Sequence, residues 1–301
     1  MTRRGWLLFG AMSVIWGIPY LLIKVAVRDL APPVLVASRT GLAALVLVPM
    51  AARKGFLAPL RPLWRPLLAF TLIEMAGPWL LLTHAEEHLP SGLAGLLVAT
   101  VPLWGTTVAF LLGERAALRP IRLAGLLVGI VGVGLLVGLG DGIGGGHWFN
   151  IAEVLLVAVG YATAPFIADR KLADVPALGV VAASLAIVAV GYLPAAIVLR
   201  PRHWPAARPL EATVALAAIC TGVAFLLFFR LIAEIGPARS TLITFLNPAV
   251  AVGLGVAFLN EDLTLGIAVG FPCILAGCWL ATRARAAEVD DPQVLPVVEP
   301  S

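Results

Sequence analysis

The sequence predicts an all-α integral membrane protein with ten transmembrane helices, arranged as two inverted five-helix repeats. The apolar fraction is 60% and the charged fraction 13%, compared with about 45–50% and about 25% in soluble domains. Uncharged runs long enough to cross roughly 30 Å of hydrocarbon recur along the chain. These runs are continuously apolar rather than alternating, which favours helices over the strands of a membrane barrel.

The third observation is a repeat at about half the chain length. The equivalent residues, at a spacing of 145 to 147 positions, are Pro102 with Pro248, Glu114 with Glu261, Gly125 with Gly270, and Gly132 with Gly277. Five spans in each half is an odd number, so the second half must enter the membrane from the opposite face. We therefore expect a first repeat at 1–145, a second at 146–285, and a disordered acidic cytoplasmic tail at 286–301.

Taken in order, the spans are separated by short connectors. They are expected at 6–27, 32–52, 64–84, 91–113, 121–140, 149–170, 176–199, 211–233, 239–259 and 264–283. Of the 21 Lys and Arg residues, 15 fall in the loops on one side and 5 in the loops on the other, while Arg39 lies within a span. The positive-inside rule then places both termini in the cytoplasm, with the protein in the cell (inner) membrane.

Prolines lie near the middle of spans one, four, six and nine, at Pro19, Pro102, Pro165 and Pro248. Proline deprives the carbonyl four residues earlier of its hydrogen bond and bends the helix. Free carbonyls at membrane depth are tolerated only where protein or a wet cavity satisfies them. The four prolines therefore predict a central binding cavity, with improved helix packing as the alternative explanation.

Polar and aromatic side chains accompany these prolines. Thr100, Trp104 and Thr107 follow one face of span four, and Ser240, Thr244 and Asn247 follow one face of span nine. Interhelical hydrogen bonding is the alternative role for these side chains, and the midplane aromatic residues could form an apolar or cation-binding pocket. The residues expected to bind substrate are Trp16, Pro19, Tyr20, Glu74, Trp79, Pro102, Trp104, Thr107, Tyr161, Thr244, Asn247 and Pro248.

Glu74 lies ten residues into span three, near the bilayer centre, where a carboxylate costs at least about 2.5 kcal/mol. Removal from water favours the neutral acid, so Glu74 is the predicted proton-coupling residue. Arg39 is its candidate charge partner, and could instead hold an anionic group of the substrate. Lys24 is expected to reach the outer interface, and Glu153 to be a solvated acid at a helix start.

A short motif raises an enzyme as an alternative. The stretch 84–88 reads HAEEH and fits the H-x-x-E-H pattern of inverted zinc proteases, with His84, Glu87 and His88 as motif residues. It falls where span three is ending, and no third acidic ligand presents itself nearby. We therefore expect neither a metal nor another cofactor, and the three cysteines, all within apolar segments, suggest no disulfide or zinc site.

The order of these motifs resembles the EamA-type transporters of the drug/metabolite transporter superfamily. The resemblance is carried by WGIPYLLIK at 16–24, by 33–39, by the proline-to-glutamate segments ending at Glu114 and Glu261, and by IGPAR at 235–239. It implies a central cavity lined mainly by spans one, three, four, six, eight and nine, with spans five and ten peripheral. The residues at positions typical of the family are Trp16, Lys24, Arg39, Pro102, Glu114, Pro248 and Glu261.

We therefore expect a secondary transporter rather than an enzyme, namely an exporter of a small metabolite, amino acid or drug that alternates access around a midplane cavity. Its expected partners are a small-molecule substrate, protons and the lipid bilayer, and no nucleic acid. Two alternatives stay open: a membrane-embedded zinc-dependent enzyme, and a non-transporting sensor or assembly subunit. GxxxG spacings on spans five and ten allow close helix contact, but do not show whether that contact is internal or makes a dimer, so the oligomeric state is not predicted.

Overall fold

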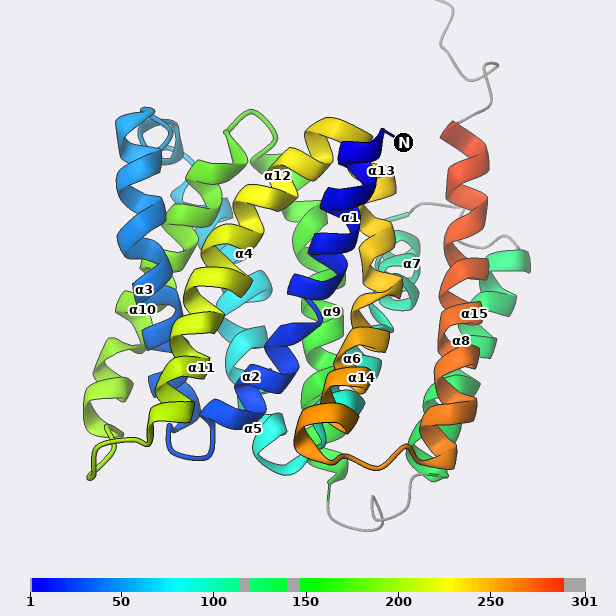
Figure 1. The fold of residues 1–301 in the computed structure, drawn as a ribbon. Coiled ribbons are helices and arrows are strands. Elements are labelled where there is room, and N and C mark those ends of the chain that lie inside the picture. The colour runs from blue at the N-terminus through cyan, green and yellow to red at the C-terminus, as the bar shows by residue number, and fades with distance from the viewer. Residues whose placement is uncertain (1, 114–119, 140–146, 290–301) are drawn as a thin grey trace, which may run out of the picture.

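The computed structural model describes residues 2–113, 120–139 and 147–289, and every regular element in these ranges is helical (Figure 1). The α-helices are α1 (Arg3–Ile15), α2 (Ile18–Ala26), α3 (Pro32–Arg53), α4 (Trp64–Thr71), α5 (Gly77–His88), α6 (Ser91–Val98), α7 (Val101–Leu111), α8 (Pro120–Gly138), α9 (Trp148–Lys171), α10 (Ala177–Val198), α11 (Ala207–Ala217), α12 (Ala224–Ile235), α13 (Pro237–Ser240), α14 (Asn247–Leu259) and α15 (Leu265–Val289). Shorter helical segments are η1 (Ala58–Leu60), η2 (Leu72–Ala76), η4 (Ala218–Val223) and η5 (Thr241–Phe245).

Within the described residues, nine helices are long and apolar enough to cross a membrane, and Leu265–Ala281 is a shorter apolar helix. The protein is thus an all-helical, multi-pass membrane protein, as the sequence predicts, while the count of ten spans stays a prediction. The ends differ by a few residues. For example, the span expected at 211–233 occupies Ala207–Ile235. Helix α15 extends to Val289, into the stretch expected to be disordered, and the rest of the predicted tail lies outside the described residues.

Proline interrupts three of the four spans in which the sequence places it near the middle. Pro19, Pro102 and Pro248 each lie in the first turn of a helix, at the start of α2, α7 and α14. This position suits proline because the first backbone N–H groups of a helix have no intrahelical partner. By contrast, α9 continues through Pro165 as one helix.

Spans one, four and nine are divided into two pieces near these prolines, and spans three and eight are divided by η2 and η4. The pieces at the end of the molecule opposite the N-terminus are α2, α5, α6, α11 and α14 (Figure 1). These five pack against one another: α2 contacts α5, α6, α11 and α14, and α6 contacts α5 and α14. This end of the molecule is therefore held together by short helices that belong to different spans.

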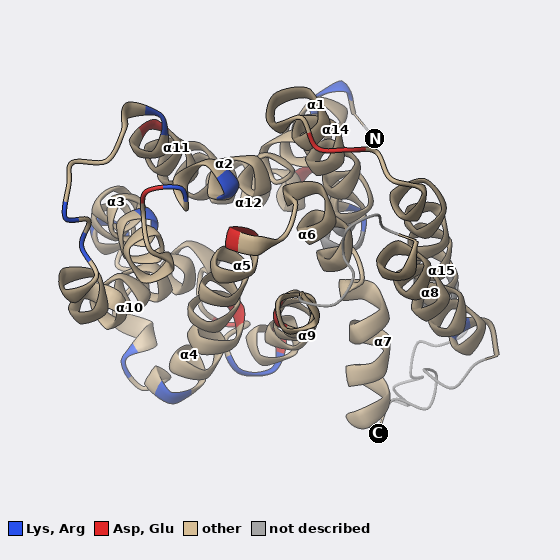
Figure 2. Cartoon of the chain, turned by 90° about the horizontal axis from the view of Figure 1, so that it is seen from below, with Lys and Arg blue, Asp and Glu red and all other residues tan. Residues whose placement is uncertain are grey.

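Helices from the two halves also pack in equivalent pairs. Helix α8 packs against α15 and α3 packs against α10. In the same way α1 packs against α12, and α9 packs against α5. Viewed along the helices, α8 and α15 form one edge of the molecule, α3 and α10 form the opposite edge, and the remaining spans lie between (Figure 2). In Figure 1 the N-terminus and the described end of α15 lie at the same side of the molecule.

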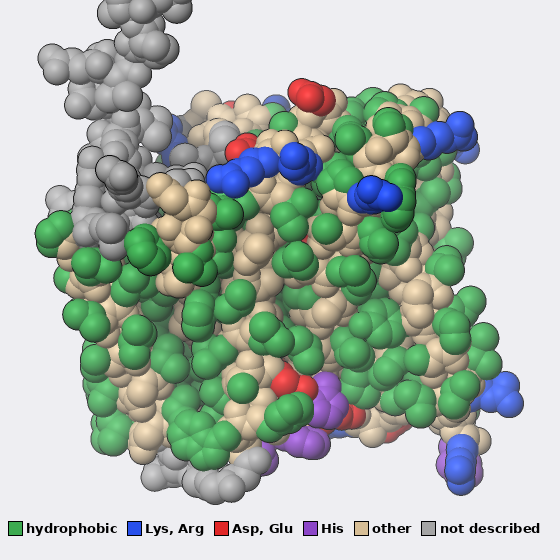
Figure 3. All heavy atoms as spheres, turned by 180° about the vertical axis from the view of Figure 1, so that it is seen from behind, with side chains coloured by type: hydrophobic (Ala, Val, Ile, Leu, Met, Phe, Trp, Pro, Cys, Tyr) green, Lys and Arg blue, Asp and Glu red, His purple; other side chains and the backbone are tan. Residues whose placement is uncertain are grey.

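Glycines bring α8 and α15 into backbone contact. A Cβ atom added to Gly132 would lie 2.7 Å from the Ile274 nitrogen, and one added to Gly277 would lie 2.5 Å from the Gly129 nitrogen. These glycines on spans five and ten therefore serve a contact within the chain. On the face drawn in Figure 3, a broad band of apolar side chains crosses the middle of the molecule, and Lys and Arg lie near the two edges, most of them near one, as expected for a surface that faces lipid.

Candidate functional site

Spans three and eight each contain a π-helical segment, η2 at Leu72–Ala76 and η4 at Ala218–Val223. Their first residues are 146 positions apart, which matches the spacing of the sequence repeat. Segments of this kind occur frequently at functional sites, because the extra residue widens the helix locally. Sequence patterns did not predict either segment. The available signal in span three was Pro78, which lacks the N–H that would bond the carbonyl of Glu74.

Arg39, on α3, reaches from the edge of the molecule to the second of these segments. It is only 9% exposed, its Nε donates a hydrogen bond to Thr221 Oγ1 at 3.0 Å, and its guanidinium carbon lies 3.9 Å from the ring centroid of Trp79. In the part of the chain that the structure describes, no acidic side chain forms an ion pair with Arg39. The pairing of Arg39 with Glu74 that the sequence suggested is therefore not formed.

Two tyrosines lie close to this arginine. Tyr20 of α2 is 8% exposed and Trp79 of α5 is 7% exposed, while Tyr161 of α9 packs against the buried clusters that contain these two residues. Both tyrosines lie within electrostatic range of Arg39. We call Tyr20, Arg39, Trp79, Tyr161 and Thr221 the central cluster. It combines one buried cation with three aromatic rings contributed by different spans.

Glu74 lies in η2 and is half-buried, and its Oε2 is shielded from solvent without a hydrogen-bond partner. Helix α9 comes very close at this point, because a Cβ on Gly160 would lie 2.6 Å from the Ile73 carbonyl oxygen. The carbonyl of Ala76, at the end of η2, accepts a hydrogen bond from the Tyr192 hydroxyl at 2.9 Å. The Ala76 carbonyl at the end of η2 therefore has a hydrogen-bond partner, whereas Oε2 of Glu74 has none.

Other predicted residues hold spans together around the central cluster. The Trp16 ring centroid lies 4.6 Å from that of Phe228 on α12. With its amide group in the orientation that satisfies its neighbours, the Asn247 side-chain nitrogen donates hydrogen bonds to the carbonyl oxygens of Ile243 at 2.9 Å and Ser13 at 3.0 Å. Asn247 therefore joins the interruption in span nine to span one.

On span four, the two predicted side chains belong to α7, which packs against α9. Trp104 and Thr107 are half-buried, and the Thr107 hydroxyl donates to the Leu103 carbonyl of its own helix at 3.2 Å. Thr244 lies in η5, directly before α14. Glu114, a family-typical position in the first half, lies outside the described residues.

Two charged residues expected near the membrane surface are held by hydrogen bonds. Lys24 Nζ donates to the carbonyl oxygens of Glu86 at 2.7 Å and Leu89 at 2.9 Å, at the end of α5, and its reach to the outer interface stays a prediction. The last carbonyls of a helix lack intrahelical partners, so a lysine beside them is favourably placed. Glu153 is not solvated: it is 7% exposed and accepts a hydrogen bond from Asn150 Nδ2 at 3.0 Å.

The HAEEH stretch makes contacts that do not resemble a zinc site. His84 Nδ1 lies 2.9 Å from Glu153 Oε1, across the contact between α5 and α9, and His84 Nε2 lies 3.9 Å from Glu87 Oε2. Over the described ranges, no three His, Cys, Asp or Glu side chains are grouped so that they could hold a metal ion. This geometry does not support the zinc-enzyme alternative.

Glu86, in the middle of the same stretch, was not predicted as a site. It is completely buried, and both of its carboxyl oxygens lack a hydrogen-bond partner. The signal in the sequence was its spacing of seven residues from Trp79, which places both on one face of a helix. Span three therefore contains a second acidic side chain with a buried oxygen that accepts no hydrogen bond.

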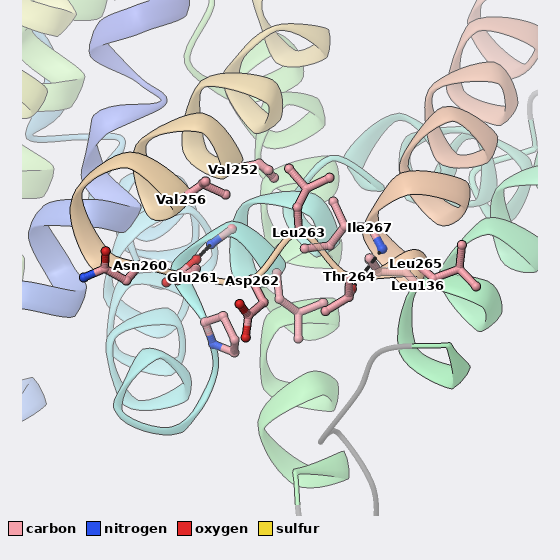
Figure 4. A pocket seen from close by; sticks show the side chains of 13 residues that line it. Leu136, Val252, Val256, Asn260, Glu261, Asp262, Leu263, Thr264, Leu265 and Ile267 are labelled. Atoms are coloured by element: carbon pink, nitrogen blue, oxygen red, sulfur yellow. Dashed lines mark hydrogen bonds between the residues drawn. The ribbon is translucent and has the colours of Figure 1, made fainter.

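A cavity of about 440 Å³ lies at the end of the molecule where α14 connects to α15 (Figure 4). The residues that line it are Pro90, Gly92, Leu93, Leu136, Val252, Val256, Asn260, Glu261, Asp262, Leu263, Thr264, Leu265 and Ile267. None of them is a predicted substrate-binding residue. This cavity is separate from the central cluster and lies beside the turn between α5 and α6.

Comparison with known proteins agrees with the fold and the repeat. The model of the EamA-like transporter family matches the chain twice, at residues 3–138 and 148–283. The uncharacterized inner membrane transporter YedA of Escherichia coli K12 is 28% identical, over 97% of this chain and 96% of its own length. The probable terminal-alkyne amino-acid exporter of Streptantibioticus cattleyicolor is 28% identical, over 78% of this chain and 80% of its own. A protein crystal structure that is 23% identical superposes with a TM-score of 0.66, covering 97% of this chain and 100% of that one.

Proposed function

Because the chain belongs to the EamA-like transporter family, we propose that it is a secondary transporter that exports a small organic molecule carrying a carboxylate, such as an amino acid. One relative is named as an amino-acid exporter, which supports this class of substrate. The proposal depends on one observation above all. Arg39 is a buried guanidinium that contacts Trp79 and Thr221 and forms no ion pair with an acidic side chain among the described residues.

The Glu86 carboxyl group lies within electrostatic range of Arg39 but forms no ion pair with it. A buried cation without a hydrogen-bonded counter-charge is unfavourable, so an anionic substrate group in contact with Arg39 would lower the free energy of this site. Trp79 holds the guanidinium against its ring, and Thr221 occupies only Nε. The two terminal nitrogens keep the planar geometry that binds a carboxylate through two parallel hydrogen bonds. Tyr20 and Tyr161 would contribute apolar faces for the rest of the substrate.

Access would alternate between the two sides of the membrane through movement of the interrupted spans. We propose ten spans in two inverted five-helix halves, supported by the repeat spacing and by the equivalent helix pairs α3 with α10 and α8 with α15. In proteins of this kind, the substrate site lies near the midplane, at interruptions in the helices. The proline breaks and the segments η2 and η4 supply such interruptions.

Glu74 would carry the coupled proton. Its Oε2 is shielded and has no hydrogen-bond partner, and intramembrane carboxyl groups of this kind mark proton pathways. The distribution of Lys and Arg supports cytoplasmic termini in an inner membrane. Export would then run from the side of the termini toward the end formed by α2, α5, α6, α11 and α14.

The test is efflux of radiolabelled amino acids from proteoliposomes that contain the purified protein. Charge-assisted hydrogen bonds contribute about 1.5–3 kcal/mol, so Arg39→Met should lower the apparent affinity by about tenfold or more. Arg39→Lys keeps the charge but loses the two-pronged geometry, and should give an intermediate effect. Arg28→Lys, at an exposed position near the end of span one, is the matched control.

Three outcomes would contradict parts of the proposal. If amino-acid amides compete as well as the parent carboxylates do, Arg39 does not bind the carboxylate. If Glu74→Gln leaves the dependence of efflux on the proton gradient intact, Glu74 does not couple protons. If no amino acid moves in either direction through the wild-type protein, the substrate class is wrong.

A further inference from the structure

The turn between α5 and α6 is held from two sides by charged side chains, and we include in it the first two residues of α6, so that it covers residues 89–92. Lys24 of α2 donates to the carbonyls of Glu86 and Leu89, at 2.7 and 2.9 Å. Glu261, in the linker between α14 and α15, accepts hydrogen bonds from the backbone nitrogens of Ser91 at 2.6 Å and Gly92 at 2.9 Å. The cation therefore meets the C-terminal end of one helix and the anion meets the N-terminal end of the next, which is the favourable arrangement at both.

The local structure of the linker directs Glu261 to this turn. Helix α14 ends at Leu259 and is followed by Asn260, which has a left-handed backbone with φ of 54°, a conformation that asparagine adopts more readily than most residues. The chain reverses there, and the Glu261 N–H donates back to the Gly255 carbonyl at 3.2 Å. In Figure 4 the Glu261 carboxylate reaches the backbone at the start of α6.

Two glycines leave room for that carboxylate. A Cβ on Gly92 would lie 3.2 Å from Glu261 Oε2, and a Cβ on Gly255 would collide with the same carboxylate. Because the obstructing atoms are the far end of a flexible side chain, alanine at 255 would displace Glu261 rather than the backbone. The chain thus provides a substitution that should release this contact while leaving Glu261 in the sequence.

The turn lies beside a completely buried carboxyl group. Glu86, whose carbonyl accepts from Lys24, is completely buried, and neither of its carboxyl oxygens has a hydrogen-bond partner. Lys24 and Glu261 belong to opposite halves of the repeat. Lys24 is carried by α2, which follows the interruption in span one, and Glu261 follows α14, the second piece of span nine.

We propose that Lys24 and Glu261 form a latch that holds α5 and α6 in the closed arrangement at this end of the molecule, and that both contacts break when the transport path opens there. The inference rests on the alternating access of the proposed function. Lys24 and Glu261 act through the turn at 89–92, and so are positioning residues rather than substrate ligands. Only hydrogen bonds change in this step.

The native Cys220 can report on the opening. It is 1% exposed and adjoins Thr221 of the central cluster. With Cys273 and Cys278 replaced by serine, a membrane-impermeant maleimide applied to proteoliposomes from one side measures access to Cys220 from that side. Lys24→Met, Glu261→Gln and Gly255→Ala should each raise the labelling rate from the side of the α5–α6 turn by about tenfold, equivalent to about 1.4 kcal/mol of closing free energy.

The controls are chosen from neighbouring positions. Arg28→Met and Asp262→Asn remove exposed charges close to the latch residues, and should leave labelling unchanged. Lys24→Arg retains hydrogen-bond donors at this position, and Cys220 in this variant should be labelled as slowly as in the wild type. A labelling rate that stays unchanged in all three latch variants, or that rises equally from both sides of the membrane as in unfolding, overturns the proposal.

The same proteoliposomes separate this inference from the proposed function. If the latch variants open the turn but the wild-type protein moves no amino acid, the latch stands and the proposed substrate class fails. If the wild-type protein exports amino acids but Gly255→Ala and Glu261→Gln label as slowly as the wild type does, the function stands and the latch is refuted.

Discussion

Replacing Gly132 by alanine should separate α8 from α15 and destabilise the protein. The added Cβ would lie 2.7 Å from the Ile274 nitrogen and 3.0 Å from the Gly270 oxygen, both backbone atoms, whereas ordinary contacts begin at 3.4 Å. Because a backbone cannot rotate aside as a side chain does, the two helices must move apart by several tenths of an ångström. Overpacking of this kind typically costs about 1–3 kcal/mol.

Gly134 lies two residues further along the same helix, and a Cβ there would meet nothing within 4 Å. Gly134→Ala should therefore be neutral or stabilise the protein by up to about 1 kcal/mol, because alanine favours a helix more than glycine does. Thermal unfolding of both variants in one detergent, followed by circular dichroism, measures the difference. Equal melting temperatures for Gly132→Ala and Gly134→Ala would refute the close contact between α8 and α15.

Two further predictions concern span three. Glu86→Gln should change the free energy of unfolding by no more than about 1 kcal/mol, because the amide matches the buried carboxyl group in shape and no hydrogen bond is lost. A loss several times larger in denaturant titration would show that the charge of the carboxylate stabilises the fold. Gly160→Ala should lower the free energy of unfolding by about 1–3 kcal/mol, because the added Cβ would lie 2.6 Å from the Ile73 carbonyl oxygen. A melting temperature equal to that of the wild type would contradict the close approach of α9 to η2.

Much of the architecture could be predicted from the sequence because it depends on local properties. Hydropathy places each span within a few residues of its observed helix, since the membrane demands about 20 apolar residues per crossing. Proline predicts the interruptions at Pro19, Pro102 and Pro248, because its missing N–H acts on its own helix. The same reasoning predicts an interruption at Pro165, but α9 continues through this residue as one helix.

The candidate site was predicted less completely. Tyr20, Arg39, Trp79 and Tyr161 were all expected near the site, yet the predicted partner of Arg39 was Glu74. The observed hydrogen-bond partner is Thr221, which lies 182 residues away in the sequence. Spacing along one helix carries no information about which side chain of another span comes within hydrogen-bonding distance. The π-helical segments were missed for a related reason, since no simple residue pattern specifies them.

The sequence by itself determined the class of protein, the order of the spans, the repeat and the residues able to carry charge into the membrane. These follow from the cost of removing polar groups from water, which each segment meets separately. Only the tertiary structure decided how each buried charge is used. Lys24 and Glu261 hold the turn between α5 and α6, Arg39 lies against Trp79, and the Glu86 carboxyl group is left without a partner. The physical reason is that a hydrogen bond depends on distances of about 3 Å, and these are set by the packing of all the spans together.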